Sequence, residues 1–252
     1  GVHPSDPVGI MRIKAEVGEN KANVDWINLF ERRDGEIFWR SNVNPKVPTG
    51  ALRTAMVEGM STLLSEVLFS RSYFALEETG LAYLCLSRGP KESEVDFEYN
   101  ATMVRVFAEA YRVRESKFGQ DTEWIDAHNC GEKNRILKFL KLVYGDRAKN
   151  ELGLFLDRLT EDGHDRGLLS IPKLHIHITN NSDPAWICER CTRVHLVKGP
   201  GFCTRCNEQL PEVANSTAGE VTELHSVGRR FKRAGAQAFR LHCEELTGQT
   251  EN

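Results

Sequence analysis

Apolar positions change their spacing several times along the first half of the chain. Short apolar and β-branched runs at 10–17 and 34–39 are separated by Gly and Asp, a pattern typical of strands or hairpins. From Thr49 to about Phe69 apolar residues recur every three or four positions, which predicts a helix that Thr49 can cap. The residues that set this spacing are Leu52, Met56, Met60, Leu63, Leu64 and Val67.

A return to short apolar runs follows this helix. Residues 73–76 and 81–86 flank Glu78, Thr79 and Gly80, and this arrangement predicts a β-hairpin. Helix and hairpin together resemble half of a winged helix. Three helices, which a complete winged helix needs, cannot be counted in this part of the sequence.

The middle of the chain has mainly helical periodicity. We expect helices near 101–115, 131–144 and 147–161, followed by a strand that alternates over 171–179. Two apolar stripes on these helices are expected to face the core: Met103, Val106, Phe107 and Ala110 in one, and Ile136, Leu137, Phe139, Leu140 and Val143 in the other.

Composition narrows the class of protein. The chain has 252 residues, 40% of them apolar, and a formal net charge of −3, which excludes a globally basic nucleic-acid binder. No leader and no run of eighteen apolar residues is evident, so we expect a cytoplasmic protein without a membrane partner. Both ends resemble cuts in a longer chain, and we expect a fragment.

Four of the seven cysteines form two Cys-x2-Cys pairs, Cys188 with Cys191 and Cys203 with Cys206. Two thiolates on one tight turn can face the same tetrahedral ion, and two such turns complete its coordination. The pattern therefore predicts a structural zinc site with no open position for catalysis. After the last cysteine of each pair, Asn207 suits the left-handed backbone expected there, and Thr192 suits it less well.

These elements together predict an α+β fold, mainly helical with small antiparallel β elements and a four-cysteine zinc ribbon. We divide the chain into a mixed α/β region (1–95), a helical region (96–170), the zinc ribbon with its flanking strand (171–215) and a basic helix followed by a strand (216–252).

Other candidate sites are weaker. His175 and His177 share one face of a predicted strand, as in some metal hydrolases, but no acidic partner lies near them in the sequence. His177 and Thr179 also fit a His-x-Thr element, whose second copy is lacking. His128 and Cys130 have no third group. The isolated cysteines Cys85, Cys130 and Cys243 are expected to be ordinary half-buried thiols.

Basic residues gather in two places. Arg190, Arg193, Lys198 and Arg205 outnumber the acidic residues of the ribbon, and a second run comprises Arg229, Arg230, Lys232 and Arg233, with Arg240 beyond it. Either group could contact phosphates, and either could be an ordinary solvated face. No phosphate-binding loop, magnesium-binding acidic box or dinucleotide motif occurs, so the chain by itself should not hydrolyse ATP.

Segment 238–250, which follows a Cys-x2-Cys pair, resembles part of the large bacterial DEAD/DEAH-box helicases of superfamily 2, in particular the DpdJ-like group of phage-defence and DNA-modification islands. Segment 103–117 is similar to an Arg-rich helix of those proteins, and 186–188 to the entry of their zinc insert. The resemblance implies that the end of the chain begins a second RecA-like lobe, with Thr247 and Gly248 near the nucleic acid. ATP and Mg²⁺ would bind only in the missing motor lobes.

Three functions follow as hypotheses. The first is a zinc-containing accessory region of an ATP-dependent helicase or translocase that contacts nucleic acid, DNA in preference to RNA, or braces the motor lobes or a partner chain. The second is a non-enzymatic zinc-ribbon adaptor that docks a protein partner. The third is a metal-dependent hydrolase centred on His175 and His177.

Overall fold

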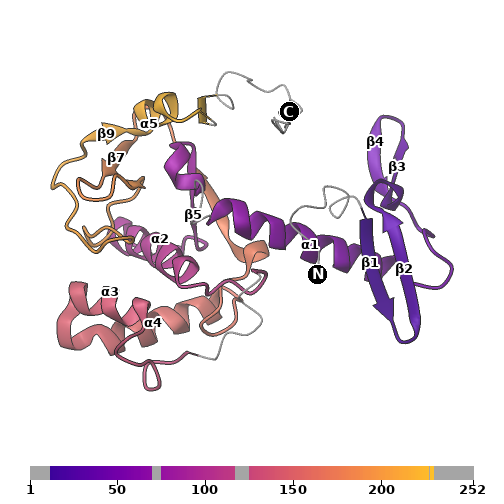
Figure 1. The fold of residues 1–252 in the computed structure, drawn as a ribbon, viewed down its shortest axis with the longest axis horizontal. Helices are drawn as coiled ribbons and strands as arrows, with labels where there is room; N and C mark the ends of the chain where they lie inside the picture. Colours follow the sequence, from indigo (N-terminus) through magenta and orange to yellow (C-terminus); the bar gives the residue numbers. More distant parts are fainter. Residues whose placement is uncertain (1–11, 70–74, 117–124, 227, 230–252) are drawn as a thin grey trace, which may run out of the picture.

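The computed structural model describes residues 12–69, 75–116, 125–226 and 228–229. They form an α+β arrangement of helices and small antiparallel sheets, as the sequence predicts. Figure 1 shows a β unit at one end, joined by one long helix to a larger body. No helix within these ranges has the length and apolar content needed to cross a bilayer.

Two hairpins build the β unit, and both confirm predicted strands. In each, strands pair antiparallel around a turn that contains a left-handed glycine, Gly18 (φ 59°) or Gly35 (φ 89°). Buried Leu29, Val47 and Leu52 form the core beneath them. The elements are β1 (Arg12–Val17), β2 (Asn20–Asp25), the 3₁₀ turn η1 (Trp26–Leu29), β3 (Phe30–Arg33) and β4 (Glu36–Trp39).

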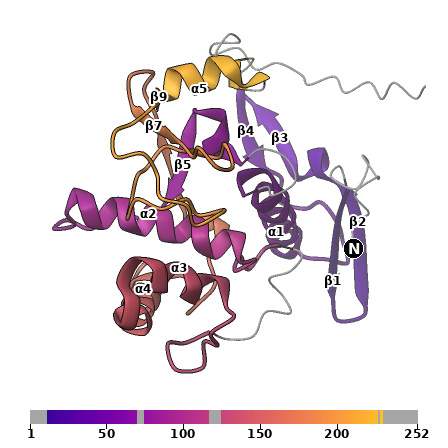
Figure 2. The same cartoon turned by 60° about the vertical axis from the view of Figure 1, so that its left-hand side comes forward.

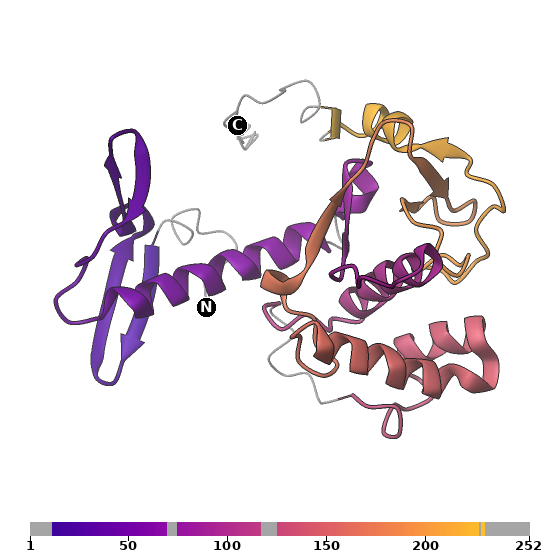
Figure 3. The same ribbon diagram turned by 180° about the vertical axis from the view of Figure 1, so that it is seen from behind.

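Helix α1 (Thr49–Leu68) leaves the β unit and reaches the larger body, as Figure 3 shows from behind. Its end near Phe69 agrees with the prediction. The predicted cap is wrong, because Pro48 occupies the N-cap position and the Thr49 hydroxyl instead donates a hydrogen bond to the carbonyl of Ser41 (2.6 Å).

The predicted hairpin after α1 is wrong. Residues Leu76–Thr79 form the 3₁₀ turn η2, and β5 (Ala82–Cys85) pairs antiparallel with β6 (His175–Ile178), far along the chain. Gly80 is the left-handed residue that ends η2 (φ 75°), not a hairpin turn. The turn residues Glu78, Thr79 and Gly80 suggested that the strand after them pairs with the strand before them. The fully buried β5 instead pairs with β6.

Three helices form the main core. Ser93 caps α2 (Glu94–Glu109) and Asn134 caps α3 (Arg135–Tyr144), each by accepting a backbone N–H, and α4 (Ala148–Glu161) follows the short turn η3 (Gly145–Arg147). The helix expected at 101–115 therefore begins earlier and ends at Glu109, beyond which Tyr111 takes a left-handed conformation (φ 62°). Both predicted stripes contribute to this core.

The final part of the described chain covers the other side of α2. Figure 2 shows α2 between the α3–α4 pair and residues 184–217, which contain the four paired cysteines and which we call the cysteine segment. The expected strand at 171–179 begins as a 3₁₀ turn, η4 (Ile171–Lys173), before β6. A three-stranded sheet of order β8-β7-β9 and a short helix follow: β7 (Pro184–Ile187), β8 (Val194–His195), β9 (Ser216–Thr217) and α5 (Ala218–Leu224).

Candidate metal centre

The first cysteine pair lies on a closed turn at the end of β7. The amide of Thr192 donates to the carbonyl of Cys188 (2.8 Å), and the amide of Cys188 donates to the carbonyl of Arg193 (2.9 Å). Thr192 itself is left-handed (φ 60°), although its branched side chain makes that conformation costly. The turn thus holds the sulfur atoms of Cys188 and Cys191 close to each other.

The second cysteine pair lies on a turn with the same two backbone hydrogen bonds. The amide of Asn207 donates to the carbonyl of Cys203 (2.9 Å), the amide of Cys203 donates to the carbonyl of Glu208 (2.8 Å), and Asn207 is left-handed (φ 62°). The sequence prediction for Asn207 is confirmed. Two equivalent turns therefore present two cysteines each toward a common point.

The four sulfur atoms lie close enough to hold one metal ion. All are within 4.8 Å of one another, and the Cys188–Cys206 and Cys191–Cys203 pairs are 3.5 Å apart. Ligands of a tetrahedral ion with bonds of about 2.3 Å would be about 3.8 Å apart. Cys188 and Cys203 are fully buried. Among the described residues these four are the group that meets the geometric requirement for a metal.

The cysteine thiols differ in the direction in which their pKa values are shifted. Burial acts to raise the pKa of Cys188, but hydrogen bonds from the amides of Cys191 and Arg190 outweigh it and leave the pKa below its usual value. Burial raises the pKa of Cys191 and, more strongly, of Cys203. Thiolates need a compensating cation when they are buried, and a dication among them would supply it.

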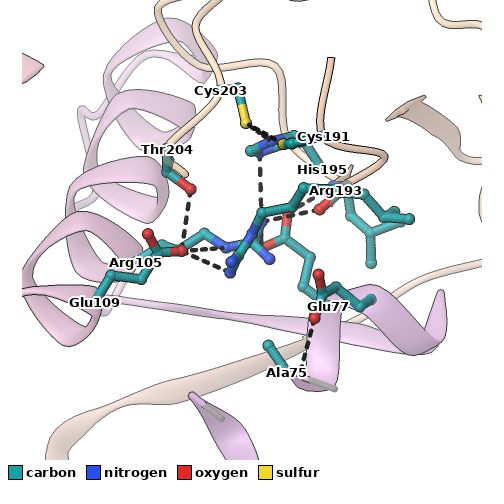
Figure 4. A network of polar contacts seen from close by, with 12 residues as sticks. Ala75, Glu77, Arg105, Glu109, Cys191, Arg193, His195, Cys203 and Thr204 are labelled. Atoms are coloured by element: carbon teal, nitrogen blue, oxygen red, sulfur yellow. Dashed lines mark hydrogen bonds and ion pairs between the residues drawn. The ribbon is translucent and has the colours of Figure 1, made fainter. Parts of the chain in front are cut away.

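One histidine contacts the cysteine cluster from outside. The Nε2 atom of His195 lies 3.3 Å from the sulfur of Cys203, and its Nδ1 atom lies 3.4 Å from Nη1 of Arg105 (Figure 4). The ring is almost completely buried. Desolvation, together with the positive charges of Arg105 and Arg193, holds the pKa of His195 well below its usual range.

Behind His195 lies a buried network of charged side chains, shown in Figure 4. Arg105 pairs with Glu77 and, more distantly, with Glu109 one helical turn away (3.6 Å). Glu109 also accepts from Arg193 (2.6 Å), and it pairs with Arg135. Because removing one partner leaves the other charge buried and unpaired, these contacts join the cysteine segment to α2.

Glu77 and Thr204 extend the network at its two sides. A carboxylate oxygen of Glu77 accepts the amide of Leu196 (2.7 Å), yet burial raises its pKa against the attraction of Arg105. The hydroxyl of Thr204 donates to Glu109 (3.2 Å), and its carbonyl accepts from Arg135 (2.6 Å). A cavity of about 20 Å³ beside Glu77 and Arg105 has room for about one water molecule.

The structure separates the basic residues predicted for the ribbon. Arg193 is buried in the network, Arg190 pairs with Glu208 (3.3 Å), and Lys198 donates to the carbonyl of Glu212 (2.5 Å). Arg205 is exposed. Burial therefore removes Arg193 from the basic face that the composition suggested, whereas Arg190 and Arg205 stay exposed.

Most of the second basic run lies outside the described residues. Arg229 is described and exposed, and its amide donates to the carbonyl of His225 (2.9 Å). The predicted nucleic-acid residues Arg230, Lys232, Arg233, Thr247 and Gly248 are not among those described.

The histidine alternatives find no metal-binding partners in the described part of the chain. His175 and His177 lie on exposed β6, where the ring of His177 stacks on that of Tyr83 (4.7 Å). Cys130 is buried in the helical core, while His128 is exposed. Packing thus accounts for His177, and no third catalytic group accompanies the other pair among the contacts described.

Sequence reasoning missed the charged network. A partial signal was present, since Arg105 and Glu109 are four residues apart inside the predicted helix 101–115. The structure adds that α2 is buried on all sides from Ala101 to Glu109. Charged residues inside such a stretch require partners. The partners come from η2, α3 and the cysteine segment, and no spacing in the sequence identifies them.

Comparison of the chain with protein-family models, curated proteins and solved structures finds no match. Functional inference therefore depends on the geometry of the molecule, and the resemblance to helicases stays a prediction.

Proposed function

We propose that the four cysteines bind one structural zinc ion and that the chain acts as a non-enzymatic adaptor that docks a protein partner. Four thiolates in tetrahedral proximity favour Zn²⁺ or iron among the biological metals, and zinc needs no redox partner. With four protein ligands the ion has no position for substrate. The thiolates also suit a reducing compartment, and we place the protein in the cytoplasm.

The observation that carries the docking role is the reversed exposure in the middle of helix α1, between residues 57 and 65. Ser61 and Ser65 are buried (5% and 6% exposed), whereas Val57, Met60 and Leu64 are exposed (50%, 49% and 43%). A surface helix normally buries its apolar stripe and exposes its polar face. Exposed apolar stripes on soluble domains mark interaction sites, so this face of α1 is suited to contact a partner.

The exposed face continues onto the β unit. The guanidinium of Arg53 lies 4.9 Å from the ring centre of Trp39, and Val57 is one helical turn beyond Arg53. We call Trp39, Val57, Met60, Leu63 and Leu64 the apolar strip; all are exposed. Val57, Met60 and Leu64 follow the i, i+3, i+7 spacing with which helices pair, so we assign the strip an amphipathic helix of a partner protein.

Photo-crosslinking tests this assignment directly. A photoreactive amino acid at Leu64 of the full chain, expressed in its native cells, should crosslink to a helical segment of another protein. The same group at Val95, an exposed apolar residue on α2, is the matched control. The crosslinked segment, made as a synthetic peptide, should bind the wild-type chain and bind Met60→Glu at least tenfold more weakly. A crosslink to a second copy of this chain, or none, contradicts the adaptor.

Direct contact with nucleic acid, as an accessory region of a helicase or translocase in phage defence or DNA modification, is the second candidate. The exposed Arg229 begins a basic run and supports this proposal. Affinity of the full chain for labelled single-stranded and duplex DNA and RNA should then fall steeply as salt rises. Reversal of Arg229, Arg230, Lys232 and Arg233 to Glu should abolish it. Undetectable or salt-insensitive binding counts against this candidate.

A further inference from the structure

His195 lies between the cysteine cluster and the buried charges, and each ring nitrogen has one close neighbour. On one side Nε2 is 3.3 Å from the sulfur of Cys203; on the other Nδ1 is 3.4 Å from Nη1 of Arg105 (Figure 4). The ring comes from β8, which pairs with β7 directly before the first metal-binding turn. Its position is therefore set by the same strands that carry the cysteines.

The neighbour of Nδ1 determines which nitrogen carries the proton. A guanidinium group has N–H donors and no acceptor, so a proton on Nδ1 would find no acceptor there, whereas a bare Nδ1 can accept from Arg105. The same Nη1 atom also pairs with Glu77 and donates to the carbonyl of Val194 (3.1 Å), so three acceptors share its two hydrogens and the contact with Nδ1 is the longest of the three. A proton on Nδ1 would place two donors against each other. In a neutral ring the proton then lies on Nε2, which points at the sulfur of Cys203.

Arg105 is itself held in place from two directions. It pairs with Glu77 on η2 and with Glu109 on the same helix (3.6 Å). Neither the guanidinium nor the carboxylates can turn toward solvent, because all three side chains are nearly fully buried. The arrangement therefore presents an N–H group to the cysteine cluster before any metal binds.

We propose that His195 is the positioning residue of the metal centre, donating an Nε2–H hydrogen bond to the Cys203 thiolate; this inference rests on the proposed zinc site. A dication with four thiolates carries a net charge of −2 in a buried place, and a hydrogen bond to sulfur withdraws part of that charge. His195 thereby links metal binding to the charged network that attaches the cysteine segment to α2. It acts through Cys203 and is not itself a ligand.

The direct test uses the full chain loaded with ¹¹³Cd and labelled with ¹⁵N. A scalar coupling between ¹¹³Cd and the Nε2 proton of His195, passing through the sulfur of Cys203, is expected. The ¹⁵N shifts should show Nε2 protonated and Nδ1 bare. A directly bonded cadmium–nitrogen coupling would make His195 a ligand and overturn the proposal, as would a proton on Nδ1.

Variants supply a second readout. His195→Phe should keep one metal per chain and a four-sulfur Co²⁺ spectrum, with metal affinity about 10–100-fold lower in chelator competition. His195→Gln, whose amide can still donate, should recover part of the loss, and His177→Phe, on exposed β6, should change nothing. Equal affinity in His195→Phe and wild type overturns the positioning role. A wild-type chain that binds no metal refutes the zinc site instead, so the two failures are distinguishable.

Discussion

Arg193 places Nη2 2.6 Å from Oε1 of Glu109, and both side chains are only 4% exposed. One residue belongs to the cysteine segment and the other to the last turn of α2, so the pair joins the candidate metal centre to the helical core. Arg193 is thereby removed from any role in binding phosphate. This ion pair supports a structural interpretation of the segment over a nucleic-acid interface.

Substituting Glu109 tests how much the buried ion pairs contribute to the stability of the fold. Glu109→Gln leaves the guanidinium groups of Arg105 and Arg193 buried without their shared carboxylate, and the free energy of unfolding should fall by about 3–5 kcal/mol. Urea unfolding of the metal-loaded chain measures the change. The matched control is Glu208→Gln, whose partner Arg190 is 66% exposed, and it should cost less than about 1 kcal/mol. A loss in Glu109→Gln that is as small as the loss in Glu208→Gln would mean that the buried ion pairs contribute little to stability.

Removing the metal should loosen one part of the molecule selectively. Chelation, or Cys203→Ser, should speed amide hydrogen exchange in residues 184–217, because the two turns then lose their shared cross-link. Exchange in α3 and α4 should stay slow, since their core contains no metal ligand. His175→Ala combined with His177→Ala should leave the metal content unchanged. An identical exchange pattern with and without metal would refute the structural role.

Two leucines on α1 should respond in opposite ways. Leu52 is fully buried in the core of the β unit, and Leu52→Ala should lower the free energy of unfolding by about 2–5 kcal/mol. Leu64 is 43% exposed, and Leu64→Ala should change it by no more than about 0.5 kcal/mol. Thermal or urea unfolding of the isolated chain distinguishes them. A large loss at Leu64 would mean that the chain itself covers the apolar strip.

His164 should make the fold sensitive to mild acid. Burial lowers the pKa of His164, whose Nδ1 accepts the amide of Ser170 (2.9 Å). The unfolded chain therefore binds a proton near pH 6.5 that the folded chain resists, so stability is complete above about pH 6.5 and falls as the pH drops below it.

Unfolding measured at pH 7.5 and 5.5 checks this dependence. His164→Gln, which retains an acceptor for Ser170 but does not titrate, should flatten the profile. His128→Gln should leave the profile as it is, since His128 is exposed. A profile that is equally steep in His164→Gln would assign the acid sensitivity to other groups.

Several features of the fold could be predicted from neighbouring residues alone. Gly35 after Asp34 makes the second hairpin, Asn134 caps α3, and the cysteine spacing brings four sulfurs to one point. In each case the atoms that interact are only a few residues apart, or repeat the same short turn. Backbone geometry within such a turn limits the outcome so strongly that the residue types determine it.

The remaining features depend on which distant segments meet. The residue types of 81–86 identify a strand, but only the folded chain shows that β5 pairs with β6. The apolar spacing of α1 was correct for a helix, yet the tertiary structure leaves Met60 and Leu64 exposed and buries Ser61.

Arg193 shows the same limit for the candidate site. In the sequence it belongs to a basic cluster; in the fold it is a buried partner of Glu109. The sequence by itself determined the two cysteine turns, because their contacts are local. The tertiary structure decided which side chains are buried, which charges pair and which apolar residues of α1 stay exposed. These properties depend on segments far apart in the chain, and no local spacing specifies how such segments meet.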